Sequence, residues 1–116
     1  MLVIKKEATD LPAEEIEELT RGFVEKLNPL RIYLFGSFAE GTYRDESDFD
    51  FYIVVSDDVG DVADATAAAY RAVRDIKKRP IDIIVGSKSR FESRKGIPSV
   101  ENEVYTKGKM IYGTGS

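Results

Sequence analysis

Apolar residues recur along the chain first at helical spacing and then in short continuous runs. Residues 11–28 carry one apolar stripe with spacings of three or four, which predicts a helix: Ile16, Leu19, Phe23 and Leu27. Asp10 and Pro12 stand near the expected start of this helix, and Asn28 and Pro29 mark its end.

Three short apolar runs predict buried strands. They cover residues 31–35, 49–55 and 81–85, and the last is expected to end at Gly86 and Ser87. Residues 38–47, after the first run, are polar and interrupted by glycine, which is typical of a loop.

Helical patterns separate and follow the second and third runs. Asp61 is predicted to cap a helix that reaches about residue 78 before Pro80, and Ser87 to cap a short turn carrying Phe91. A last helix is expected over residues 98–107, with Pro98 in its first turn and Gly108 after its end.

Alternating strands and helices in a chain of 116 residues predict one small α/β (α+β) domain. Few strands and short connections favour a mixed β-sheet with helices packed on it. Residues 1–116 are interpreted as one unit, with residues 113–116 as a small polar tail that frays.

The chain has neither cysteine nor histidine. A disulfide framework, a thiolate zinc site and a Ser-His-Asp type of triad are therefore excluded, and any chemistry must use carboxylates and hydroxyls. The net charge of -4 argues against direct nucleic-acid binding or an anionic membrane partner. The apolar residues 2–4 are too few for a signal peptide or a membrane span, so a cytoplasmic protein is expected.

Three aspartates stand out in the second and third runs. Side chains alternate along a strand, so Asp48 and Asp50 share a face with Tyr52, while Phe49 and Phe51 point into the core. Asp82 is the one charge inside its apolar run, and it joins the pair if the two strands are neighbours. Carboxylates without histidine favour Mg²⁺ or Mn²⁺, and Mg²⁺ in such sites is commonly shared with substrate phosphates.

Gly36 and Ser37 directly follow the first strand. If they open a helical turn, free backbone N–H groups and the missing side chain of Gly36 favour a phosphate there. Each feature has a simpler explanation: the Asp48–Asp50 pair as solvated charges, Gly-Ser as an ordinary turn, and Asp82 paired with Arg79 or Lys78. Their occurrence together favours a functional site.

The stretch LFGSFAEGTYRDESDFDFYIVV, followed by PIDIIV, resembles the minimal nucleotidyltransferases (MNT) of the DNA polymerase β-like superfamily, particularly MNT antitoxins that are paired with HEPN toxins. The resemblance preserves a strand, Gly-Ser, ten residues, Asp-x-Asp on a second strand and a third Asp on a later strand. The closing segment SVENEVYTKGKMIYG also looks like the family's last helix and final apolar stretch.

The resemblance assigns roles to the site residues. It implies that Gly36 and Ser37 bind the β and γ phosphates of ATP, that Asp48 and Asp50 hold two Mg²⁺ ions, and that Asp82 binds one metal ion and acts as the base. All three aspartates would thus be catalytic and metal-binding.

The chain departs from the family in the loop after Ser37. Many relatives carry a basic residue there, and this chain has Phe38, Ala39 and Glu40, so Arg44 is the candidate for a further nucleotide contact. Arg44 as a solvated loop charge is the alternative.

The leading hypothesis is an antitoxin that transfers AMP from ATP to a tyrosine of a partner HEPN toxin, in a homo- or hetero-oligomer. It is favoured by the short chain, in which about 30 residues follow the third strand and leave no room for an added substrate-binding domain. A nucleotidyltransferase that modifies a small molecule such as an aminoglycoside, and an antitoxin that neutralises its partner by binding alone, are the alternatives.

Overall fold

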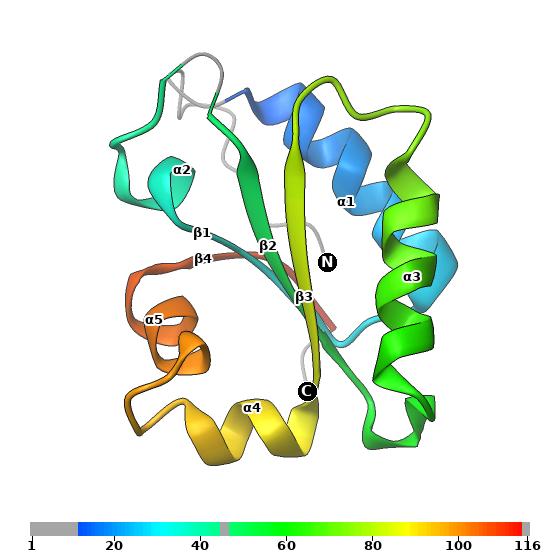
Figure 1. Cartoon of the computed structure of the whole chain (residues 1–116), viewed down its shortest axis with the longest axis vertical. Helices are drawn as coiled ribbons and strands as arrows, with labels where there is room; N and C mark the ends of the chain where they lie inside the picture. Colours follow the sequence, from blue (N-terminus) through cyan, green and yellow to red (C-terminus); the bar gives the residue numbers. More distant parts are fainter. Residues whose placement is uncertain (1–11, 45–46, 115–116) are drawn as a thin grey trace.

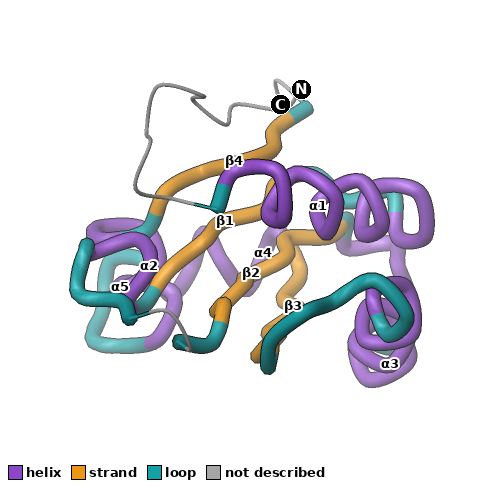
Figure 2. The backbone as a smooth tube through the Cα atoms, turned by 90° about the horizontal axis from the view of Figure 1, so that it is seen from above, coloured by secondary structure: helices purple, strands orange, loops and turns teal. Residues whose placement is uncertain are grey.

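The computed structural model describes residues 12–44 and 47–114. A four-stranded mixed sheet with the strand order β3-β2-β1-β4 forms its centre (Figures 1 and 2). Its strands are β1 (Arg31–Phe35), β2 (Phe49–Val55), β3 (Ile81–Ser87) and β4 (Lys109–Gly113). β1 pairs antiparallel with both β2 and β4, while β2 and β3 run parallel. The predicted mixed α/β sheet is confirmed.

Helices cover both faces of the sheet. α1 (Ala13–Leu27) and α3 (Val62–Val73) lie on one face, and α4 (Lys88–Arg94) and α5 (Val100–Lys107) on the other (Figure 1). The helix α2 (Ser37–Glu40) follows β1, and a 3₁₀ turn, η1 (Asp57–Val59), follows β2. Each helix buries an apolar stripe against the sheet, which is why the spacing of three and four could be recognised in the sequence.

The core is divided between the two faces. The larger cluster joins Phe23 of α1 and Ala69 of α3 to Phe49 and Phe51 of β2. The smaller cluster joins β1 and β2 to α4 and α5: Tyr33, Phe35, Tyr52, Val54, Phe91 and Val104. The expectation of a single aromatic core face was therefore incomplete, because α4 and α5 cover the Tyr52 side as well.

Several element bounds differ from the prediction. α3 begins after its predicted cap, Asp61, but ends at Val73 rather than near residue 78. Beyond Val73 the amide of Arg74 bonds back only three residues, to Arg71, so the helix tightens into turns well before Pro80. α1 begins after Pro12; residues 10 and 11 of its predicted start lie outside the described residues.

β3 continues through Gly86 and Ser87, which were predicted to end it. Gly86 pairs with Val54 in the parallel ladder, and a side chain at position 86 would overlap the Tyr52 hydroxyl. Gly86 is thus a strand residue that lets the Tyr52 hydroxyl pack against the backbone, and it does not form a turn. Ser87 still caps α4, as predicted, by accepting a hydrogen bond from the Arg90 amide.

The C-terminal elements also needed correction. α5 begins after Ser99, whose hydroxyl accepts from the Asn102 amide, so Pro98 precedes the helix. Gly113 belongs to β4, and the Thr114 amide donates to the Leu30 carbonyl, so the chain is still tied to the sheet where a frayed tail was expected. Residues 115 and 116 of that tail lie outside the described residues. The helical turn expected after Gly36 is present as α2, which takes in the first residues of the polar stretch and buries Phe38.

Candidate active site

Gly36 forms a sharp turn between β1 and α2. Its backbone has φ 75° and ψ −151°, a conformation almost restricted to glycine. The Gly36 carbonyl accepts from the amides of Ala39 and Glu40, both at 3.1 Å, which closes the first turn of α2. A Cβ at position 36 would overlap Oδ2 of Asp50 and lie 3.1 Å from its Cγ. The turn and the aspartate are therefore packed directly together.

Asp50 and Asp82 lie side by side on neighbouring strands. In the parallel ladder between β2 and β3, Asp50 pairs with Asp82, and in the antiparallel ladder Asp50 pairs with Phe35. Asp50 is half-buried, whereas Asp82 is exposed between the buried side chains of Ile81 and Ile83. The adjacency expected from strand alternation is confirmed.

Asp48 is exposed and lies directly before β2. The negative charge of Asp48 acts on the carboxylate of Asp50. The pKa of Asp50 is raised to about 6, mostly by burial and further by the charges of Asp82 and Asp48, a hydrogen bond with Asp82 and the charge of Glu103. The three predicted aspartates thus form one electrostatic unit, with more negative charge than the protein neutralises locally.

Carboxylate oxygens and an uncompensated negative charge fit a divalent cation such as Mg²⁺. Among residues 12–44 and 47–114, no group of three or more His, Cys, Asp or Glu side chains is arranged so that it could hold a metal ion. Mg²⁺ does not require one, since it commonly uses one or two carboxylates and takes its other ligands from water and phosphate. Asp50 and Asp82, which are paired on neighbouring strands, therefore fit an open site shared with a phosphate-bearing substrate, and Asp48 as a further ligand stays a prediction.

A protein-family model described as "Nucleotidyltransferase domain" matches residues 16–110. This span holds all three aspartates and the Gly36 turn. The chain belongs to the nucleotidyltransferase domain family. No curated protein matches it.

Solved structures support the nucleotidyltransferase fold. A putative nucleotidyltransferase from Sulfolobus solfataricus has 20% sequence identity and a TM-score of 0.62, over 87% of this chain and 79% of that one. A toxin–antitoxin complex with AMP-PNP has 24% identity and a TM-score of 0.51, and a mutant MntA-HpeT toxin–antitoxin complex has 22% and 0.57. Each of the last two alignments covers 90% of this chain and 76% of that one. At these identities the likeness establishes the fold.

The remaining predicted nucleotide contacts of this nucleotidyltransferase lie in the segment after β1. Ser37 is half-buried at the start of α2, and its carbonyl accepts from the Thr42 amide. Arg44 is exposed, and its amide donates to the Ser47 hydroxyl at 2.7 Å. The structure thus places Ser37 beside the Gly36 turn, while the role of the Arg44 side chain stays a prediction.

Two charged residues near the site were not singled out in the sequence. Glu103, on α5, is one of the charges that raise the Asp50 pKa, but no motif marked it. Arg79 was considered as a partner of Asp82 and as one of the basic residues that complement a helix C-terminus. Its guanidinium instead forms a two-point ion pair with Glu15, with Nε–Oε2 and Nη2–Oε1 both 3.0 Å.

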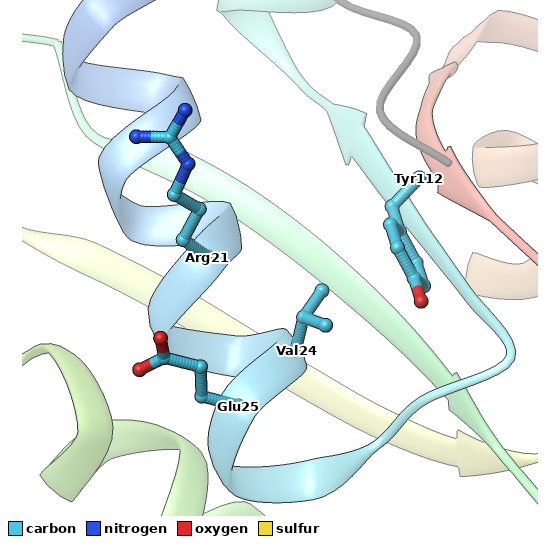
Figure 3. Close-up of a pocket in the computed structure, with 4 residues that line it drawn as sticks. All are labelled: Arg21, Val24, Glu25 and Tyr112. Carbon is cyan, nitrogen blue, oxygen red and sulfur yellow. The ribbon is translucent and has the colours of Figure 1, made fainter.

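A separate hollow of about 260 Å³ lies between α1 and β4. Figure 3 shows its lining, which contains Arg21, Val24, Glu25 and Tyr112 and none of the predicted site residues. None of the helices in the described part of the nucleotidyltransferase combines the length and apolar character that crossing a membrane needs.

Proposed function

We propose that this chain is a Mg²⁺-dependent adenylyltransferase that moves AMP from ATP to a hydroxyl group. The observation that carries the proposal is the contact of Asp50 with both Gly36 and Asp82, because it unites the Gly-Ser turn with carboxylates from two strands. A phosphate turn beside a cation site is what transfer from a nucleoside triphosphate requires.

The chain's own groups have distinct roles in this proposal. The turn at Gly36 and Ser37 holds the β and γ phosphates, because its backbone leaves room that a side chain would fill. Asp48, Asp50 and Asp82 hold the divalent cations. When bound, these cations supply neutralisation of the charge that grows on the α-phosphate and on the leaving pyrophosphate.

Asp82 is proposed as the base. It is the one carboxylate of β3 and is exposed on this edge strand, so an acceptor hydroxyl can approach it from solvent. The hydroxyl oxygen forms a bond to the α-phosphorus, the bond from that phosphorus to the β-phosphate oxygen breaks, and pyrophosphate leaves. Asp82 takes the proton from the attacking hydroxyl. No histidine is required.

We further propose that the acceptor is a tyrosine of a HEPN-type toxin, and that the modification makes this chain an antitoxin. Toxin–antitoxin complexes, one with AMP-PNP, are among the solved structures that share its fold. The chain also covers about three quarters of those structures' chains, and its sheet carries no separate substrate-binding domain in the described residues.

The test is transfer of label from α-labelled ATP with Mg²⁺ to the protein encoded by the neighbouring gene. The wild-type chain should label that protein, and the Asp48→Asn, Asp50→Asn double variant should not. A parallel reaction with a small polyhydroxylated alcohol and no second protein tests small-molecule transfer. Labelling of the partner by the double variant would contradict the proposal. If the inactive double variant still neutralises the partner, the chain is an antitoxin that works by binding.

A further inference from the structure

Arg79 lies where three segments of the candidate active site meet. Besides its two bonds to Glu15, its Nη1 donates to the Ser47 carbonyl at 3.3 Å. Its guanidinium carbon also lies 5.1 Å from the ring centre of Phe38 and 4.6 Å from that of Phe49. The guanidinium group of Arg79 thus makes hydrogen bonds through its N–H groups, at the edge of its plane, and cation–π contacts with two aromatic rings.

Each of these contacts adjoins a predicted site residue. Phe38 directly follows Ser37 of the phosphate turn, and Ser47 directly precedes Asp48. Arg79 itself begins the segment that leads through Pro80 to Asp82, and the Pro80 carbonyl accepts from the Phe49 amide at 3.2 Å. The guanidinium therefore connects the segments that carry the phosphate turn, the first aspartate and the third.

The ion pair that anchors Arg79 is shielded from solvent. The side chain of Arg79 is 18% exposed and that of Glu15 is 12% exposed, compared with 65% and 27% for the Arg21–Glu17 pair on α1. A two-point pair of this kind fixes the orientation of the guanidinium plane as well as its position. Through Glu15, helix α1 contacts the candidate active site. No predicted site residue lies on α1.

We propose that Arg79, oriented by Glu15, is a positioning residue for the active site. It sets the distance between the Gly36–Ser37 turn and the aspartates on β2 and β3 without touching the substrate. This inference rests on the proposed function for its effect on nucleotide binding, but the ordering of the segments is a property of the fold alone.

Lysine cannot replace arginine in this arrangement. A lysine ammonium at position 79 can pair with Glu15, but it has no planar group that reaches the Ser47 carbonyl while it covers two rings. Arg79→Lys therefore keeps the charge and removes the geometry. The matched control is Arg21→Lys, which makes the same exchange in the exposed pair with Glu17.

The first measurement is calorimetric binding of AMP-PNP in the presence of Mg²⁺. Arg79→Lys should weaken binding by about tenfold or more, in the range found when residues that orient metal ligands are changed. Arg21→Lys should stay within about twofold of wild type, since exposed pairs contribute little. Wild-type affinity in Arg79→Lys would overturn the proposal.

The second measurement is amide hydrogen exchange without nucleotide, which does not depend on the proposed function. Arg79→Lys should speed exchange at Phe49, whose amide bonds to Pro80, and leave Ala69 in α3 unchanged. Equal acceleration at both amides would indicate general destabilisation and overturn the positioning role. If Arg79→Lys does not fold, Glu15→Gln, which removes only the anchor's charge, should give the same pattern.

The two measurements separate the two proposals. If the wild-type chain does not bind Mg²⁺ with AMP-PNP, the proposed function fails. The exchange rate at Phe49 then still decides whether Arg79 orders the start of β2 beside Pro80.

Discussion

Gly36 and Asp50 are packed so closely that no side chain fits between them. A Cβ on Gly36 would overlap the Asp50 carboxylate, and the backbone of Gly36 already adopts a positive φ of 75°. The residue that starts the phosphate turn and the central aspartate of the site thus constrain each other. Backbone strain and steric fit both require glycine at this position.

Gly36→Ala should therefore reduce stability and also displace Asp50. Gly41→Ala is the control for a positive φ without a steric overlap, because Gly41 has a φ of 79°, with a ψ of 13° in place of −151°, and no atom within 4 Å of an added Cβ. Gly41→Ala should cost about 1 to 2 kcal/mol from backbone conformation alone. Urea unfolding should show a larger loss for Gly36→Ala, and calorimetry should show loss of Mg²⁺-dependent AMP-PNP binding for that variant only. Equal losses in both variants would contradict the steric argument.

Asp50→Asn should stabilise the metal-free protein and abolish its response to metal. Burial and the charges of Asp82 and Asp48 disfavour a carboxylate at position 50, and a neutral amide is free of both penalties. In EDTA at pH 7.5 the variant should melt at a higher temperature than wild type. Addition of Mg²⁺ and AMP-PNP should then raise the melting temperature of wild type only. A variant that melts lower in EDTA would show that the carboxylate is compensated within the protein.

Glu101 should make folding sensitive to acid. It is fully buried, and burial acts to raise its pKa, but hydrogen bonds outweigh this and hold the pKa below its usual value of 4.5. Their donors are the Tyr52 hydroxyl, the backbone of Glu101, and the side chains of Arg94 and Arg90. Because the folded pKa is lowered, this stabilisation is present above about pH 4.5 and is lost as the pH falls through the folded value.

Urea unfolding at pH 6.5 and pH 3.5 checks this sensitivity. The free energy of unfolding should fall more in wild type than in Glu101→Gln, whose amide does not titrate but still offers an oxygen to Tyr52. Glu18→Gln, at an exposed position of α1, should keep the wild-type dependence. A Glu101→Gln profile parallel to wild type would refute the assignment.

Tyr70 should protect the open edge of the sheet at β3. Its hydroxyl accepts a hydrogen bond from the Ile83 amide at 3.0 Å, on a strand that has a neighbour on one side only. Tyr70→Phe should cost about 0.5 to 1.5 kcal/mol and speed amide exchange at Ile83. Tyr105→Phe, at another exposed tyrosine, should change neither quantity. Unchanged exchange at Ile83 in Tyr70→Phe would show that the hydroxyl is not needed there.

The parts of the fold that could be predicted are those governed by local pattern. β1 and β2 have the predicted bounds, because nearly continuous burial leaves runs that are apolar except at Arg31 and Asp50. Strand alternation likewise predicted that Asp50 and Asp82 lie together, since side-chain direction has a period of two.

The errors arose where distant contacts override local signals. Gly86 was interpreted as a strand end because nothing in the sequence shows that the Tyr52 hydroxyl occupies the space of its side chain. The Arg79–Glu15 pair joins residues 64 positions apart, so the more local Asp82 was the partner considered. The early end of α3 at Val73 has a local cause instead: its apolar spacing continues to Ile76, but the amides of Arg74 and Ile76 bond back only three residues.

The most direct test of nucleotidyl transfer compares ATP labelled at the α-phosphate with ATP labelled at the γ-phosphate. Wild-type chain, Mg²⁺ and the neighbouring gene's product are incubated with each label, beside the Asp48→Asn, Asp50→Asn double variant. The account predicts that the α label alone becomes covalently attached to the partner, in wild type only, with release of pyrophosphate. Transfer of the γ label, or α labelling by the double variant, would contradict it.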